Sequence, residues 1–338
     1  MSNREKSTAH GAALSSQVAY RVTHVIDYKE QAIIDGLPQF GFHDHTGALY
    51  KLDYHKNFMG LLSPAGFVWT AGESNPNLAP VHFTVQLDHP KYAARAFQHD
   101  TLLVSEEKCI YQMDLSTNRF FPLIDKEKAG IVDIGNCVYD HQDTIWVNDI
   151  RGCRIFHFQY DGTLIEVLGN GEPGFQRDAV PFEQARFHWM YDLRLGPDGN
   201  LYVLDSKNFA VRKIDIKART VSTVCGDGIG GYTGDGGDTK LARLGTDPQE
   251  FFDGPWSLHV DEQNNIFIGD TQNHAVRCIH AGISIITTIA SRLDTAPGGS
   301  PARFEKICGM DYWNGTLYIP DWRSDAPNTG IILQRQSE

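Results

Sequence analysis

The sequence predicts an all-β protein, a single six-bladed β-propeller whose ring is closed by an N-terminal strand. Three observations predict this fold. A strand–turn–strand frame that ends on an acidic residue recurs six times, turn and aromatic residues are abundant, and one alternating segment near the N-terminus has no hairpin partner. The 338 residues include 32 Gly, 15 Pro, 18 Phe and 13 Tyr, a composition typical of many strands joined by many turns.

The recurring frame is clearest in two segments, Leu193–Asp205 and Leu258–Asp270. In each, a short strand with alternating apolar residues is followed by a polar turn and by a second apolar strand that ends on aspartate. The frame recurs more loosely elsewhere, and the six acidic residues that end it are Asp53, Glu106, Asp149, Asp205, Asp270 and Asp321. They lie 43 to 65 residues apart, which is the size of one four-stranded blade with variable loops.

Ring closure follows from the two ends of the repeat. The last frame is followed by one further candidate strand, 330–334, so the final blade lacks a fourth strand. Residues Val18–Ile26 alternate well and precede the first blade. We predict that this strand pairs with the final blade and so removes an exposed sheet edge. The chain then consists of a disordered tail at 1–16 and one propeller domain at 17–338.

Two of the acidic residues are followed by a closely similar pattern. The chain reads Asp205-Ser-Lys-Asn208-Phe-Ala210 and Asp270-Thr-Gln-Asn273-His-Ala275, and a glycine-rich segment at 225–238 precedes the fifth frame. These segments resemble the NHL-repeat propellers. The resemblance implies a propeller in which an arginine after Asn-His ties neighbouring loops. Alanine stands at that position here, so we expect other residues to connect the blades on this face.

Charge and hydropathy exclude several classes of function. The formal net charge of −12 argues against a nucleic-acid partner or an anionic membrane surface, since either needs a basic patch. There is no apolar run of about 18 residues that would cross a membrane, and the first 16 residues do not resemble a secretory signal. We therefore expect a cytoplasmic protein. The six cysteines lack CxxC spacing, so we expect free and mostly buried thiols.

The glycine-rich segment raises the question of a cofactor. Gly226–Gly231 matches GxGxxG, but the residues that follow cannot form the helix that a dinucleotide site needs. Asp227, Asp235 and Asp238 carry oxygen ligands that calcium prefers, although aspartates that cap backbone amides explain the loop equally simply.

Zinc is the other metal to consider, because the chain has 14 histidines. The resemblance extends to lyases of this fold that hold zinc through histidines at the starts of innermost strands, but no histidine stands at the matching positions, which are Gln39, Ala93, Gly135, Tyr191, Trp256 and Cys308. No cofactor is required, and a divalent metal, calcium or zinc, stays open.

The candidate site lies on the innermost strands of blades four to six. Residues i and i+2 share one face of a strand, so one face carries Asp192 with Arg194, then Ser257 with His259, then Asp311. Buried charges are costly unless they are paired or hydrated. This face therefore forms either a water-filled channel with structural ion pairs or a ligand pocket at the channel mouth.

In the pocket interpretation each residue has a role. We expect Asp192 to act as general base or metal ligand, Arg194 to keep it ionised or to clamp an anionic group, and His259 to shuttle a proton. Asp311 would orient His259. The residues expected to contact substrate at the rim are Gln39, Asn136, Tyr191, Trp256 and Ser257. If Arg194 and His259 lie too deep to reach a ligand, they are structural and the rim alone forms the site.

The sequence leaves two classes of function open. The first is a small-molecule enzyme of the lyase, hydrolase or isomerase type, with its ligand on the face that carries the long connections at 72–91, 169–188, 226–252 and 290–306. The alternative is a non-catalytic propeller that binds a protein or peptide. The motifs of serine hydrolases, P-loop proteins and zinc proteases do not occur. We favour the enzyme.

Overall fold

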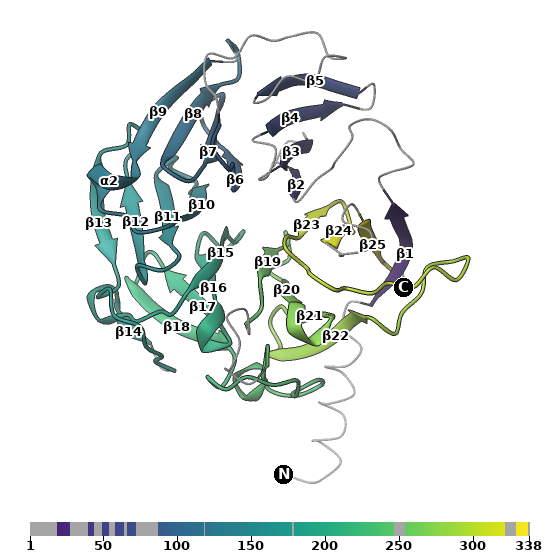
Figure 1. The fold of residues 1–338 in the computed structure, drawn as a ribbon. Helices are drawn as coiled ribbons and strands as arrows, with labels where there is room; N and C mark the ends of the chain where they lie inside the picture. The colour runs from purple at the N-terminus through teal and green to yellow at the C-terminus, as the bar shows by residue number, and fades with distance from the viewer. Residues whose placement is uncertain are drawn as a thin grey trace.

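The computed structural model describes residues 19–27, 40–43, 49–53, 58–63, 66–71, 87–117, 119–177, 179–246, 254–321 and 329–336. These residues form a single all-β propeller (Figure 1). Each sheet runs outward from an innermost strand near the centre of the ring. The predicted fold class, all-β with one propeller, is confirmed.

Five sheets are built from consecutive strands. The first comprises β2 (Phe40–His43), β3 (Leu49–Asp53), β4 (Phe58–Ser63) and β5 (Gly66–Ala71). The second comprises β6 (Tyr92–Arg95), β7 (Thr101–Ser105), β8 (Cys109–Asp114) and β9 (Arg119–Asp125), with helix α2 (Lys126–Ala129) after it. The third comprises β10 (Ile134–Tyr139), β11 (Ile145–Asp149), β12 (Arg154–Phe158) and β13 (Leu164–Leu168).

The fourth and fifth sheets follow the same plan with short 3₁₀ turns. The fourth comprises β15 (Met190–Leu195), β16 (Leu201–Asp205), β17 (Ala210–Asp215) and β18 (Thr220–Cys225), and β14 (Val180–Pro181) is added at its outer edge. The fifth comprises β19 (Ser257–Val260), β20 (Ile266–Asp270), β21 (Ala275–His280) and β22 (Ile285–Ser291). The 3₁₀ turns are η1 (Phe182–Gln184), η2 (Ser206–Asn208), η3 (Thr239–Leu241) and η4 (Thr271–Asn273).

The remaining sheet is composite, with the strand order β1-β25-β24-β23. Its strands are β1 (Tyr20–Asp27), β23 (Asp311–Trp313), β24 (Thr316–Asp321) and β25 (Thr329–Arg335). β1 pairs antiparallel with β25, from Tyr20 opposite Arg335 to Asp27 opposite Thr329. The predicted pairing of an N-terminal strand with the last sheet is therefore confirmed. Five blades, not six, are formed from one continuous segment each, because the C-terminal segment supplies only three strands.

The acidic residues that define the sequence repeat hold the connections between blades. Four of them are 0% exposed: Asp149, Asp205, Asp270 and Asp321. Each accepts a hydrogen bond from a backbone N–H in the segment that leads into the innermost strand of its own blade. The Asp205 carboxylate accepts from His188 N at 2.7 Å, and that of Asp270 from Gly245 N at 2.8 Å. The repeat thus records a structural requirement, because each buried carboxylate needs such donors.

Two buried arginines connect neighbouring segments where the arginine of the NHL-like pattern is replaced by alanine. Arg212 and Arg277 are both 0% exposed and lie two residues after the alanines at that position. Arg212 Nη1 donates to Asp205 Oδ2 at 2.9 Å and to the carbonyl of Arg186 at 3.2 Å. Arg277 Nη2 donates to Asp235 Oδ1 at 2.8 Å. The inter-blade connection is therefore kept, with the guanidinium supplied from the third strand.

The glycine-rich segment covers a sheet edge. Gly236 N donates to Ile286 O at 2.8 Å and Thr239 N to Ser284 O at 3.1 Å, so the segment runs along the outer side of β22. At Gly226, where φ is +102°, an added Cβ would lie 2.3 Å from the Phe209 carbonyl oxygen. The only helix in this described segment is the three-residue η3. The residues that match GxGxxG therefore cover the edge of a sheet. They do not lead into the helix that a dinucleotide site needs, as the sequence predicted.

The core lies between neighbouring sheets, and the cysteines belong to it. One cluster of buried side chains joins the third and fourth sheets through Trp146, Phe187 and Leu193. All six cysteines are free thiols, and five of them are buried while Cys308 is half-buried, as the sequence predicts. Within the described ranges, no helix is long and apolar enough to cross a membrane.

Candidate functional site

The two ends of the central channel differ in structure. The innermost strands β2, β6, β10, β15, β19 and β23 surround the centre of the ring (Figure 1). Each begins after a connection from the preceding blade and ends at the turn that leads to the second strand of its own blade. We call the first end the crossover face and the second end the hairpin face. The sequence predicts the site on the crossover face.

A cavity of about 360 Å³ opens on the hairpin face. It is lined by the last residues of five innermost strands and by the turns that follow them. Two predicted catalytic residues, Arg194 and His259, line it. Several of the other lining side chains are aromatic, and Tyr92, Tyr139, Tyr312 and Trp313 are among them.

Arg194 reaches across the channel beneath this cavity. Its Nη1 donates to the hydroxyl of Tyr92, and its guanidinium lies 4.6 Å from the centre of that ring. Its Nε donates to the carbonyl oxygen of Leu258 at 2.9 Å. Strands from the second, fourth and fifth sheets are thereby joined through one side chain. Arg194 forms the floor of the cavity.

Asp192 lies below that floor and is only 4% exposed. Its carboxylate accepts a hydrogen bond from Asn136 Nδ2, one from Leu258 N at 2.8 Å, and an ion pair from Arg194 Nε at 3.0 Å. Burial raises the pKa of Asp192, while the charge of Arg194 and the Leu258 N–H oppose that rise. Asp192 does not line the cavity. Its geometry suits holding Arg194 in place.

His259 is half-buried on β19, and its ring centre lies 5.9 Å from that of Tyr312. Burial raises the pKa of Tyr92 to about 12 and also raises the pKa of Tyr312. Both phenols are therefore neutral near pH 7. A histidine is the side chain whose charge ordinarily changes near this pH. The cavity thus combines an imidazole, a paired guanidinium and neutral phenols.

The other predicted site residues lie away from this cavity. Tyr191 and Trp256 pack together near the crossover face with ring centres 6.2 Å apart. Ser257 is 0% exposed and Asp311 is 2% exposed, and neither lines the cavity. Gln39 lies outside the described residues. The structure therefore brings Asn136 to Asp192, packs Tyr191 against Trp256, and places Arg194 and His259 in the lining of one cavity.

Sequence reasoning missed the aromatic walls. Phe97, Tyr139, Tyr312 and Trp313 stand at or just after the ends of innermost strands. The recurring frame is centred on these strands, so an aromatic residue near the end of the first strand in three frames was the available signal. The prediction relied on strand starts, where ligands usually bind in propellers of the resembled family.

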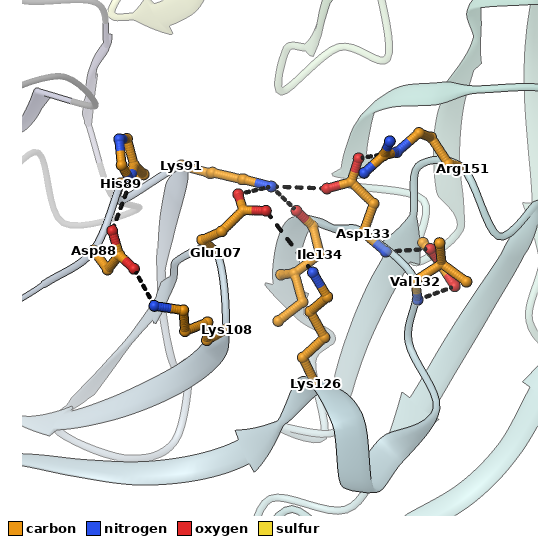
Figure 2. A network of polar contacts seen from close by, with 11 residues as sticks. Asp88, His89, Lys91, Glu107, Lys108, Lys126, Val132, Asp133, Ile134 and Arg151 are labelled. Carbon is orange, nitrogen blue, oxygen red and sulfur yellow. Dashed lines mark hydrogen bonds and ion pairs between the residues drawn. The ribbon is translucent and has the colours of Figure 1, made fainter.

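The crossover face carries a separate polar network (Figure 2). Lys91 Nζ lies 3.1 Å from Glu107 Oε2 and 2.9 Å from Asp133 Oδ1. The same carboxylate forms an ion pair with Arg151, whose Nε lies 2.9 Å from Asp133 Oδ2. Lys91 directly precedes β6 and Asp133 directly precedes β10. The network therefore ties the second blade to the third at the starts of their innermost strands.

The structure offers no support for the metal alternatives. No group of three or more His, Cys, Asp or Glu side chains among the described residues is arranged to hold a metal ion. Asp227 pairs with Arg243 at 3.0 Å, and Asp238 accepts from Lys240 N at 2.9 Å. Asp235 pairs with Arg277 at 2.8 Å. The three aspartates of the proposed calcium loop thus bind different partners.

The comparison with curated proteins concerns part of the chain. No protein-family model matches it. The chain is 27% identical over 143 residues to NHL repeat-containing protein 2 of Bos taurus, which is 42% of this chain and 19% of that protein. It is 30% identical over 115 residues to protein SUPPRESSOR OF QUENCHING 1, chloroplastic, of Arabidopsis thaliana, which is 33% of this chain and 10% of that protein. The resemblance to NHL-repeat proteins is confirmed. The chain spans less than a fifth of the length of these relatives.

Solved structures share the propeller fold over most of the chain. An auxiliary nutrient binding protein from Bacteroides ovatus superposes with a TM-score of 0.62 at 14% identity, over 95% of this chain and 78% of that chain. Virginiamycin B lyase from Staphylococcus aureus superposes with a TM-score of 0.53 at 9% identity, over 93% of this chain and 99% of that chain. At these identities the similarity shows the fold alone. The fold neighbours thus include an enzyme and a binding protein.

Proposed function

We propose that the chain binds a small organic molecule in the cavity on the hairpin face, and that His259 transfers a proton to or from it. The observation that carries this proposal is the cavity itself, about 360 Å³ in volume, with His259 and Arg194 in its lining. Ligand pockets typically have volumes of roughly 300–1,000 Å³ and are mainly apolar with a few placed polar groups.

The proton-transfer role rests on the neighbours of His259. A general acid–base group needs to change its protonation state near the working pH, and an imidazole does so ordinarily. Arg194 and Tyr92 line the same cavity, where Arg194 Nη1 donates to the Tyr92 hydroxyl. Such a site fits an isomerase or lyase reaction, in which one proton moves and no metal-bound water is needed. We infer that the composite sheet serves as a sixth blade around this site.

A second candidate function is binding without turnover. The observation that favours it is that the N–H groups of Arg194 are bonded to Tyr92, Leu258 and Asp192, so the guanidinium is committed to protein partners. A transition state that gains negative charge would then be stabilised less strongly. The two candidates share the cavity and differ in the role of His259.

The experiment tests binding first and turnover second. Benzyl alcohol serves as the binding probe, followed by ligand-observed NMR. Ala94→Leu narrows the cavity and should abolish the signal, whereas Phe121→Leu, on the outer strand β9 with 51% exposure, should leave it unchanged. If Ala94→Leu folds and still binds as the parent does, the cavity is not the site.

Turnover is then measured with a panel of β-elimination substrates and of small ketones from which an α-proton can be removed. His259→Asn should retain probe binding and lose about a hundredfold or more of any activity found, since general acid–base groups contribute roughly 10²–10⁴-fold. Parental activity in His259→Asn would remove the catalytic role. Probe binding without turnover of any panel member would favour the binding protein.

A further inference from the structure

The cavity has an unequal distribution of charge. Its two arginines are each paired with a carboxylate, Arg194 with Asp192 at 3.0 Å and Arg95 Nη2 with Asp100 at 2.8 Å. Both basic groups are therefore neutralised locally. Glu262 adds an exposed carboxylate at the turn after β19, and its neighbour Asp261 also lines the cavity. The Asp261 carboxylate is buried and accepts a hydrogen bond from Asn265 Nδ2 at 2.8 Å. Among the described residues, carboxylates therefore outnumber guanidinium groups around the cavity.

Aromatic faces stand at the open side of the same cavity. Phe97 is 40% exposed and Trp313 is 37% exposed, and both line it. The face of an aromatic ring carries negative electrostatic potential and attracts cations within about 6 Å of its centre. The cavity already contains one such contact, because the Arg194 guanidinium lies 4.6 Å from the centre of the Tyr92 ring. The same chemistry is therefore available to a cationic ligand at the rim.

Both arginines that an anionic ligand could meet in this cavity are already paired with carboxylates. The N–H donors of Arg194 that have partners are directed to Leu258 O, the Tyr92 hydroxyl and Asp192 Oδ2. An anion would have to compete with Asp192 for this guanidinium and would be repelled by Glu262. Unpaired charges that enter a partly desolvated site are disfavoured.

We infer that the ligand of this cavity is an organic cation, a primary amine or quaternary ammonium compound that carries an apolar group. The inference rests on the proposed function, since it names the ligand class of the same cavity. The ammonium group lies at the rim, where Phe97, Trp313 and the Glu262 carboxylate line the cavity. The apolar group enters between the tyrosines further inside.

Three probes of the same size and different charge test this inference. Benzylamine is cationic, benzyl alcohol neutral and benzoate anionic at pH 7. Benzylamine should bind about two- to fivefold more tightly than benzyl alcohol, as a cation–π contact at an exposed site predicts, and benzoate most weakly. Glu262→Gln should lower the affinity for benzylamine and leave that for benzyl alcohol unchanged. Glu127→Gln, on the remote helix α2, is the control.

The outcomes separate the two proposals. If benzyl alcohol or benzoate binds at least as tightly as benzylamine, and Ala94→Leu abolishes that binding, the cation inference is wrong while the cavity still binds ligands. An equal loss of benzylamine affinity in Glu262→Gln and Glu127→Gln would also refute it. If none of the three probes shows binding that Ala94→Leu abolishes, the proposed function fails and the inference fails with it.

Discussion

Replacing Asp192 with asparagine tests whether this carboxylate is structural. The substitution keeps the shape of the side chain and removes its charge. The carboxylate now accepts from Asn136, Arg194 and Leu258 N, and the pair formed with Arg194 is almost fully buried, with side-chain exposures of 6% and 11%. Asparagine can keep one acceptor oxygen for Leu258 N. Its amide group would then face the donors of Asn136 or Arg194.

The expected loss follows from the unpaired guanidinium. Removing one partner of a buried ion pair costs about 3–5 kcal/mol, because the remaining charge stays buried without compensation. Because the hydrogen bond from Leu258 N is retained, we expect the smaller loss in this range, a decrease of about 3 kcal/mol in the free energy of unfolding. Asp192→Asn with Arg194→Gln should recover part of this loss, because replacing both members removes the buried charge.

Urea denaturation followed by tryptophan fluorescence measures the effect. Glu172→Gln is the matched control, since Glu172 is 66% exposed and its pair with Arg186 should contribute less than about 1 kcal/mol. An Asp192→Asn variant whose free energy of unfolding lies within about 1 kcal/mol of the parent would refute the structural role. The general-base role predicted from the sequence would then regain support.

Three further predictions concern other parts of the fold. Gly226→Ala should lower the free energy of unfolding in urea by about 2 kcal/mol or more. Gly236→Ala, where φ is +76° and nothing lies within 4 Å of an added Cβ, should lower it by about 1 kcal/mol. Equal effects of the two substitutions would contradict the close approach at Gly226. Burial lowers the pKa of His280, so the unfolded chain takes up its proton at higher pH than the fold. The parent should therefore lose stability relative to His280→Gln as the pH falls from 7.5 to 5, by at most about 1.4 kcal/mol per pH unit, and a pH-independent difference would disprove this. Deleting residues 1–28 removes β1 and should abolish cooperative unfolding, whereas deleting 1–14 should not; calorimetry that shows the same transition for both deletions would show that closure is dispensable.

The fold was predictable because its signals are local. The frame that ends at Asp205 or Asp270 recurs because each carboxylate must bind nearby backbone N–H groups and the arginine of the next strand. The alternating segment near the N-terminus has no hairpin partner and the last blade lacks a fourth strand. Together these two observations predicted that the segment pairs with the last blade. The prediction of six blades was wrong in that the described residues form five continuous blades, because the same repeat spacing describes a continuous blade and a composite sheet equally well.

The cavity on the hairpin face was not predicted from the sequence, for a different reason. Alternation placed Asp192 and Arg194 on one strand face, which is confirmed by their ion pair. This alternation does not show whether the charges of Asp192 and Arg194 neutralise each other or act on a ligand. The cavity depends on contacts across the ring, such as that from Arg194 to Tyr92, which are 102 positions apart in the chain. No local pattern records a contact of that kind.

The composite sheet has a consequence for synthesis of the chain. β1 is translated long before its partner β25, because the two strands lie at opposite ends of the propeller segment. At roughly 5–20 residues per second, the 309 positions between Tyr20 and Thr329 take about 15–60 s to translate. Throughout that interval the edges of β1 and of each newly made blade stay open to other chains. Chaperones that shield β1 on the nascent chain are thus expected to raise the yield of folded protein.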